Sequence, residues 1–262
     1  MNAMIPLLAL RTQEVVRTWR VWVLPGVLVF LAATGPVITR FTKEILAGAL
    51  GGGEFGAIPI PDPTAADAAG RWITDLSQLA VFVVVVMAAG AISSEVRSGV
   101  ASLLLVKPAS RVAYVVSHAV VLMLFVAVAA LLGATVSWAV TGLVFDGAAG
   151  GVELVALLGA TGVWVVLAAV LIAISLLASA AFDGMAAAAG IGIGAFFLLS
   201  LAGMAPRLAE FTPAGLIPAA SAIATGASLN AATIWWPVAT GLVLAALLLA
   251  TAVITFQRKE LR

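Results

Sequence analysis

The residues best placed to do chemistry lie in "SSEVRSGVASLLLVKPASRVAY", residues 93–114, the most polar stretch within an apolar part of the chain. Between two long runs with almost no charge, this stretch carries Glu95, Arg97, Lys107 and Arg111. The single histidine, His118, follows shortly afterwards. One carboxylate and one imidazole are not the paired acids or histidine cluster that an intramembrane enzyme needs. The pattern therefore favours a contact surface over a catalytic centre.

The composition indicates that most of the chain lies in lipid. Of the 262 residues, 63% are hydrophobic and 10% are charged, and the mean hydropathy is +1.21, whereas about a quarter of residues are charged in soluble domains. A net charge of +1 argues against a nucleic-acid partner. The absence of cysteine excludes disulfides and thiolate metal sites. We expect an integral protein of the cell membrane, with no removable signal peptide.

Apolar runs predict an all-α fold with six membrane spans in a single transmembrane domain, residues 1–262. A span needs about 20 apolar residues. Six stretches meet this need, at about 21–39, 73–93, 112–145, 154–181, 185–203 and 235–256. We expect no charged residue inside any span, which disfavours an ion pump and suits a hydrophobic or amphipathic substrate.

An even number of spans places both termini on one side of the membrane. Basic residues fall mainly in the segments on that side, so the termini and residues 94–111 are expected in the cytoplasm. Residues 1–20 have one apolar face and one charged face, with Arg11 on the charged face, which predicts a helix lying along the lipid surface. The apolar, proline-broken segment 204–234 predicts an extracytoplasmic helical hairpin before the last span.

Residues 94–111 predict a short helix with two unlike faces. Ser94 is a suitable N-cap, and Pro108 forces the chain out of helical geometry after about Val106. The valines and leucines share one face, and the opposite face is small and polar, with Glu95, Ser98, Gly99 and Ser102. A glycine in mid-helix costs about 1 kcal/mol relative to alanine, which suits close approach of another backbone. Helix geometry alone leaves a plain polar loop as an equal alternative.

The order Glu95, Gly99, Leu104, Pro108, Ser110 and Arg111 resembles the pattern Glu-x-x-x-Gly-x-x-x-x-Leu-x-x-x-Pro-x-Ser-Arg between the second and third spans of ABC-2-type permeases, the membrane subunits of type V-like ATP-driven exporters. The predicted layout is similar as well, with six spans, an N-terminal amphipathic helix and a hairpin before the last span. One departure is His118, where many relatives carry a lysine a few residues after the arginine.

The resemblance implies that residues 94–111 are a coupling helix on which a cytoplasmic ABC ATPase subunit docks. Glu95 would face that subunit, and its neighbours in the interface would be Arg97, Ser98, Gly99, Ser102, Lys107, Pro108 and Arg111. The chain has no Gly-x-x-x-x-Gly-Lys-[Ser/Thr] motif, so ATP and magnesium are expected in the partner and no cofactor or catalysis in this chain. A second permease, identical or related, completes the implied assembly. Membrane lipid surrounds it.

Three other functions stay open. An ATPase-coupled sensor that transmits force without transport would use the same coupling helix. A secondary transporter would need intramembrane charges or symmetric broken helices. An intramembrane enzyme is disfavoured for the reason given above.

Several single residues have two interpretations each. His118 either has a function inside the membrane or is solvated near its surface. Asp183 either caps the fifth span or contacts the ATPase, and capping is the stronger expectation. Gly190 and Gly194 of "GIGIG" predict close helix packing. Trp138 and Trp164 are expected to pack against neighbours or lipid, and a membrane-surface belt is predicted from Trp19, Trp22, Trp72, Trp235 and Trp236.

Overall fold

The computed structural model describes residues 4–18, 20–49, 61–101, 110–145, 151–228 and 230–259. Within these ranges every regular element is a helix. Six of the described helices are long and apolar enough to cross a membrane, namely Val21–Arg40, Ala65–Arg97, Arg111–Val144, Leu154–Ala181, Met185–Ala202 and Ala231–Arg258. The six predicted spans agree with these helices, and the chain is a multi-pass, all-helical membrane protein.

The helices follow the chain in a simple order. They are α1 (Met4–Arg17), α2 (Arg20–Arg40), α3 (Thr42–Ala49), α4 (Ala65–Asp75), the π-helix η2 (Leu76–Ala80), α5 (Val81–Arg97), α7 (Arg111–Val144), α8 (Leu154–Ala181), α9 (Met185–Ala202), α10 (Pro206–Phe211), the 3₁₀ turn η4 (Pro213–Gly215), α11 (Leu216–Ala224) and α12 (Ala231–Arg258).

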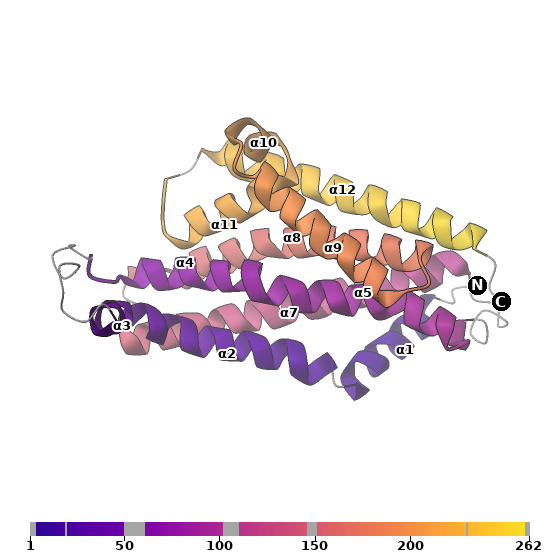
Figure 1. The fold of residues 1–262 in the computed structure, drawn as a ribbon, viewed down its shortest axis with the longest axis horizontal. Coiled ribbons are helices and arrows are strands. Elements are labelled where there is room, and N and C mark those ends of the chain that lie inside the picture. Colours follow the sequence, from indigo (N-terminus) through magenta and orange to yellow (C-terminus); the bar gives the residue numbers. More distant parts are fainter. Residues whose placement is uncertain are drawn as a thin grey trace.

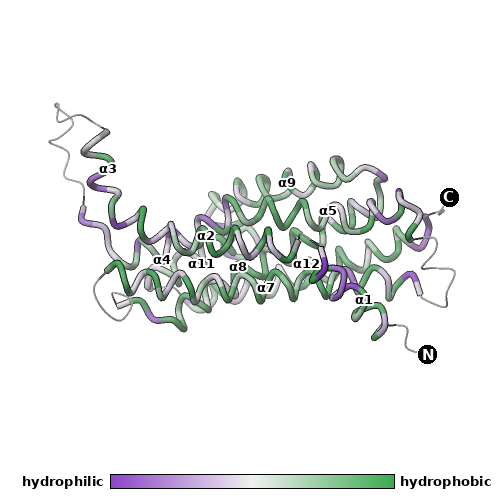
Figure 2. Tube along the Cα trace, turned by 90° about the horizontal axis from the view of Figure 1, so that it is seen from below, coloured by the Kyte–Doolittle hydropathy of each residue, from purple (hydrophilic) through white to green (hydrophobic). Residues whose placement is uncertain are grey.

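The long helices run along the long axis of the molecule, and both termini lie at the same end (Figure 1). We call this the terminal end, and α5 finishes and α7 begins there. The opposite, distal end carries α3 and α11, and α3 leads away from an otherwise apolar bundle (Figure 2). Helix α8 is central, because it packs against α5, α7, α9, α11 and α12. Helix α11, which lies between α9 and α12 in the sequence, packs on α8 and α4.

The second spanning helix is longer than predicted. A capping box between Thr64 and Asp67 starts it at Ala65, eight residues before the expected boundary, and it continues without a break through α4, η2 and α5 to Arg97. The prediction of charge-free span interiors is wrong at Asp75, which lies within the predicted range 73–93 and is buried in this helix. Its carboxylate accepts a hydrogen bond from Arg71 Nε at 2.8 Å, so the buried charge has a partner one turn away.

The tryptophans divide between the core and the surface. Trp72 is only 1% exposed and donates its indole N–H to Thr161 Oγ1 at 3.1 Å, so its assignment to a surface belt is wrong. Trp164 is buried, and Trp138 donates to the carbonyl of Val152, so both pack within the protein. The remaining described belt candidates are exposed, as expected for Trp22, Trp235 and Trp236. Trp19 lies outside the described residues.

The close packing expected at Gly190 and Gly194 is found at Gly192 instead. A Cβ at Gly192 would lie 2.6 Å from Val85 Cγ1 and closer still to Ser175 Oγ, whereas a Cβ at Gly190 or Gly194 would meet nothing within 4 Å. Helix α9 therefore presents the middle glycine to α8 and α5. The composition of the repeat could not decide this, because all three glycines are equally small.

This orientation of α9 predicts that the same substitution at the three glycines changes stability by unequal amounts. Gly192→Val overpacks the contact with α8 and α5, and we expect it to lower the free energy of unfolding by about 1–3 kcal/mol. Gly190→Val and Gly194→Val point into open space and should change it by much less. Thermal unfolding followed by circular dichroism in one detergent measures all three. Equal destabilisation by the three variants would show that α9 is rotated from this orientation.

Candidate functional site

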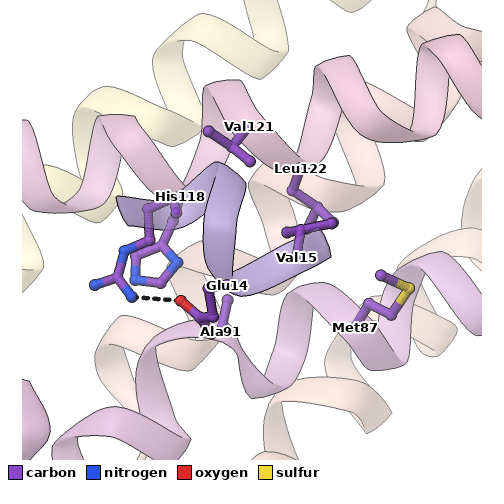
Figure 3. A pocket seen from close by; sticks show the side chains of 8 residues that line it. Glu14, Val15, Met87, Ala91, His118, Val121 and Leu122 are labelled. Atoms are coloured by element: carbon purple, nitrogen blue, oxygen red, sulfur yellow. Dashed lines mark hydrogen bonds and ion pairs between the residues drawn. The ribbon is translucent and has the colours of Figure 1, made fainter. Parts of the chain in front are cut away.

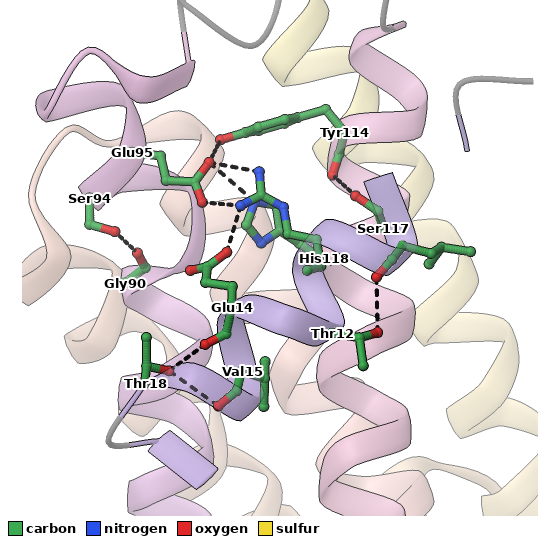
Figure 4. A network of polar contacts seen from close by, with 12 residues as sticks. Thr12, Glu14, Val15, Thr18, Gly90, Ser94, Glu95, Tyr114, Ser117 and His118 are labelled. Carbon is green, nitrogen blue, oxygen red and sulfur yellow. Dashed lines mark hydrogen bonds and ion pairs between the residues drawn. The ribbon is translucent and has the colours of Figure 1, made fainter. Parts of the chain in front are cut away.

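Glu95 lies near the end of α5 and is buried, with 8% of its surface exposed. Arg11 of α1 binds its carboxylate through two hydrogen bonds: Nη1 donates to Oε1, and Nη2 donates to Oε2 at 2.8 Å. Tyr114 of α7 donates its hydroxyl to Oε2 at 2.6 Å. The side chains converge from three helices, as Figure 4 shows for Glu95 and Tyr114. A two-pronged arginine contact of this kind is among the stronger polar contacts in proteins.

Two further aromatic side chains complete the surroundings of Glu95. His118 lies one turn after Tyr114 on α7, and its Nε2 is 3.6 Å from Glu95 Oε2. The Tyr114 ring stacks on Phe256 of α12, with centroids 5.1 Å apart and planes within 11°. The Arg11 guanidinium also lies 5.1 Å from the centre of the Tyr114 ring. We refer to Arg11, Glu95, Tyr114 and His118 as the Glu95 cluster.

Arg11 is charged in this setting. Burial lowers its pKa, but the hydrogen bond and the charge of Glu95 outweigh burial, and Glu14 Oε2 adds a second contact at 2.7 Å, so the pKa lies above its usual value. Beside this contact is a cavity of about 20 Å³, enough for roughly one water molecule. It is lined on one side by Glu14 and His118 and on the other by Met87 and Leu122 (Figure 3).

The helix predicted to begin at Ser94 does not begin there. Ser94 lies inside α5, where its hydroxyl donates to the carbonyl of Gly90. Helix α5 ends after Arg97, and Gly99 follows with φ = +76°, a left-handed conformation that glycine adopts without strain. Gly99 therefore ends a helix, and the mid-helix role predicted for it is wrong. Helical geometry resumes at Val100 and Ala101.

The candidate interface residues are divided by this turn. Arg97 and Ser98 are exposed, as a docking surface requires, whereas Glu95 is buried, although it contributes to the lining of a groove between α1 and the end of α5. The reason is that α5 runs one turn further than predicted and Arg11 neutralises the buried carboxylate. Ser102, Lys107 and Pro108 lie outside the described residues.

Arg111 starts α7 and is tied to the end of α12. Its Nη1 donates to the carbonyls of Phe256, Gln257 and Lys259, at 3.2, 2.8 and 2.8 Å. The Phe256 carbonyl also accepts the backbone N–H of Lys259 at 3.3 Å, and a cation at a helix C-terminus is favoured by the helix dipole. The contact therefore holds the start of α7, the third spanning helix, against the end of α12, the last spanning helix.

Asp183 does not cap α9, contrary to expectation. The N-cap position is Gly184, and no side chain bonds there. The Asp183 carboxylate instead lies 2.7 Å from Lys259 Nζ, which also donates to the carbonyl of Ala180 at 3.1 Å. The turn between α8 and α9 is thus connected to the end of α12. Capping failed as a prediction because a nearby cation attracts the carboxylate more strongly than a backbone N–H does.

The Asp183–Lys259 pair predicts a pH dependence. The hydrogen bond and charge of Lys259 hold the pKa of the Asp183 carboxyl below its usual value. The pair therefore stabilises the folded state above the unfolded pKa, and this contribution is lost as pH falls through the lower folded pKa. We expect a carboxyl titration by ¹³C NMR to give a depressed pKa for Asp183. Lys259→Met should return it toward the usual value, and an unchanged titration would contradict the pairing.

Sequence reasoning missed two members of the Glu95 cluster. Arg11 was assigned to the charged face of a lipid-surface helix, but it is only 4% exposed. Tyr114 was not considered, although it and His118 are the only tyrosine and histidine in the chain and are spaced to share a helix face. His118 is also buried, so its solvated interpretation is wrong. Among the described residues, no three His, Asp or Glu side chains gather to hold a metal ion.

Comparison with known proteins identifies the family and leaves its activity open. No curated protein matches the chain. A family model described as "Protein of unknown function (DUF2705)" matches residues 57–262, which includes every spanning helix except the first. The chain therefore belongs to the DUF2705 family.

Proposed function

We propose that this chain is the permease subunit of an ATP-driven exporter, coupled to a separate cytoplasmic ABC ATPase and paired with a second permease. In this proposal the terminal end of the bundle faces the cytoplasm, and the turn after α5 receives the ATPase. The observation that supports it is that the end of α5 and the start of α7, on either side of the connecting segment, both make polar contacts with other helices at the terminal end.

The two flanks are fastened to different helices. On the α5 side, Glu95 is joined to α1 through Arg11 and to α7 through Tyr114. On the α7 side, Arg111 is joined to the carbonyls at the end of α12. A push on the connecting segment would therefore move four helices together. This linkage suits a device that converts closure of an ATPase into a change across the membrane, whereas a slack loop would absorb the motion.

A surface beside the break has the shape and charge to receive a partner. A groove of about 560 Å³ runs between α1 and the end of α5, with Arg17, Gln13 and Val100 among its lining residues. The exposed Arg97 and Ser98 lie next to Val100 in the chain. A groove with charged walls and two exposed apolar residues, Leu10 and Val100, favours a protein partner, because the charges can guide the partner's approach and the apolar side chains can be buried on binding.

Glu95 itself is a poor probe of coupling. Replacing it with alanine would leave Arg11 buried without its main partner, so folding and coupling would fail together. Arg97 is exposed, so replacing it can test binding of the ATPase without disturbing the fold. We expect Arg97→Glu to reduce at least tenfold the co-purification of an ABC ATPase expressed from a neighbouring gene, with unchanged thermal unfolding. Arg40→Glu, an exposed reversal at the far end of α2, is the matched control.

Failure of any neighbouring ATPase to co-purify with the unmodified chain would overturn the proposal. ATP-dependent release of substrate from vesicles distinguishes an exporter from a subunit that only transmits force. Cysteines at Ser98 and Ser228, both exposed and at opposite ends of the bundle, test its orientation. Ser98→Cys should react with an impermeant maleimide only in opened cells, and Ser228→Cys in intact ones.

A further inference from the structure

A second cavity lies near the distal end, away from the Glu95 cluster. Its volume is about 470 Å³, within the range of small-molecule sites. Three segments line it: Ser77 and Gln78 of η2, Phe196 and Phe197 of α9, and Ala214 of η4 with Ile217 of α11. None of the described residues that line it is ionisable. A charged group inside it would have no counter-charge, so the cavity selects against ions.

Ser77 is a polar group in this wall without a partner. The residue is 4% exposed, and its hydroxyl makes no hydrogen bond within the described part of the chain. The other two hydroxyls of the lining are satisfied, since Thr74 donates to the carbonyl of Gly70 and Ser200 to that of Phe196. A buried hydroxyl without a partner is uncommon in native proteins and calls for an explanation.

The local backbone presents Ser77 in an unusual way. Residues Leu76–Ala80 form a π-helix between two α-helical segments, a widened turn that costs stability and is often found at functional sites. Both polar residues that line the cavity from this element, Ser77 and Gln78, lie within the widened turn. The turn therefore places Ser77 and Gln78 in one wall of a mainly apolar space, with the Ser77 hydroxyl oxygen buried in that wall.

The opposite wall is aromatic. Phe82 and Phe196 pack edge to face, with ring centroids 6.0 Å apart, and the exposed Phe197 ring is tilted against both, at 6.3 and 5.6 Å. Gly203 brings the end of α9 against η4 so closely that a Cβ there would lie 2.6 Å from the carbonyl oxygen of Ala214. Aromatic faces and a fixed backbone favour a flat, rigid apolar guest over a flexible chain, because such a guest loses little entropy on binding.

We propose that this cavity binds an uncharged aromatic amphiphile, with its rings against Phe196 and Phe197 and one hydrogen-bond acceptor receiving the Ser77 hydroxyl. The proposal stands on the cavity alone and does not depend on an ATPase partner. It accounts for the unpartnered hydroxyl, the absence of ionisable groups among the described lining residues and the aromatic wall together.

The test uses the purified full chain in phosphatidylcholine nanodiscs, without ATPase or nucleotide. The probe is benzophenone, an uncharged two-ring ketone that couples to nearby C–H bonds under near-ultraviolet light. We expect saturable labelling of the peptide containing Phe196 to Met204. Benzanilide, an amide of similar shape, should compete for that labelling, and Ile217→Trp should abolish it by filling the space.

The hydrogen bond is tested by pairing ligand and residue changes. Bibenzyl has two rings and no hydrogen-bonding group. The preference is the ratio of the bibenzyl to the benzanilide concentration that halves the labelling. Ser77→Ala, which removes the hydroxyl, should decrease this ratio by roughly three- to tenfold. Ser137→Ala is the matched control, because the Ser137 hydroxyl is also buried and has no hydrogen-bond partner among the described residues, but Ser137 lines none of the cavities described above. Comparing this ratio between variants cancels the different partitioning of the two competitors into lipid, because the partitioning is the same for each variant.

Two results would overturn the proposal. One is labelling of this peptide that does not saturate or that benzanilide cannot displace, as expected if lipid chains fill the space. The other is an equal ligand preference in Ser77→Ala, Ser137→Ala and the unmodified chain. A third measurement separates binding from structure: since the Ser77 hydroxyl has no partner, Ser77→Ala should not lower the unfolding temperature, and a clear decrease would assign the residue a structural role instead.

Discussion

Replacing Arg11 with alanine should lower the free energy of unfolding by roughly 3–5 kcal/mol, the usual effect of removing one partner from a buried ion pair. Arg11 is 4% exposed and supplies two of the hydrogen bonds that Glu95 accepts. Without it, the contacts left to the carboxylate among the described residues are the Tyr114 hydroxyl and His118 at 3.6 Å, and Glu95 is only 8% exposed. For a chain of this size, the loss corresponds to a decrease of about 10 °C in unfolding temperature.

Two companion variants make the result specific. Arg17→Ala removes an exposed arginine from the same helix and should change the unfolding temperature little. Arg11→Met combined with Glu95→Gln removes both charges and should be much more stable than Arg11→Ala alone, because no unpaired ion remains. If Arg11→Ala and Arg17→Ala unfold at the same temperature in the same detergent, Arg11 is not buried against Glu95.

Replacing Trp72 with alanine is expected to cost about 3 kcal/mol or more. Its indole fills the space between α4 and α7 so tightly that a Cβ on Gly133 would lie 2.6 Å from Trp72 Cη2, and its N–H bonds to Thr161 of α8. In a membrane protein the loss comes from the void and the missing contacts, because lipid is as apolar as the core. Thr161 would also lose a hydrogen-bond donor.

The matched variant for Trp72→Ala is Trp22→Ala. Trp22 is 80% exposed on α2 and touches little of the protein, so its removal should shift the unfolding temperature by no more than a few degrees. Circular dichroism at 222 nm follows both without relying on tryptophan emission. A small effect of Trp72→Ala, similar to that of Trp22→Ala, would restore the surface-belt assignment that the fold contradicts.

The sequence by itself determined the class of the protein and its spanning helices. Lipid offers no partners to backbone polar groups, so an apolar run of sufficient length must form a helix whatever its neighbours are. The predicted span 154–181 accordingly coincides with α8, and 112–145 differs from α7 by one residue at each end. The second span was misjudged because its start depends on a capping box among polar residues, Thr64 and Asp67, which apolar run length does not detect.

Only the tertiary structure decided which side of each helix faces protein. In a soluble protein the buried face is apolar and the exposed face polar, but here both are apolar, so periodicity cannot separate lipid-facing residues from buried ones. The structure accordingly differs from the predictions in three places: the packing glycine of α9 is Gly192, and the side chains of Trp72 and Arg11 are buried. The Glu95 cluster joins residues 84 positions apart in sequence, Arg11 and Glu95, and no local pattern carries such a pairing. Packing brought them together, because a carboxylate inside the bundle is stable only beside a cation.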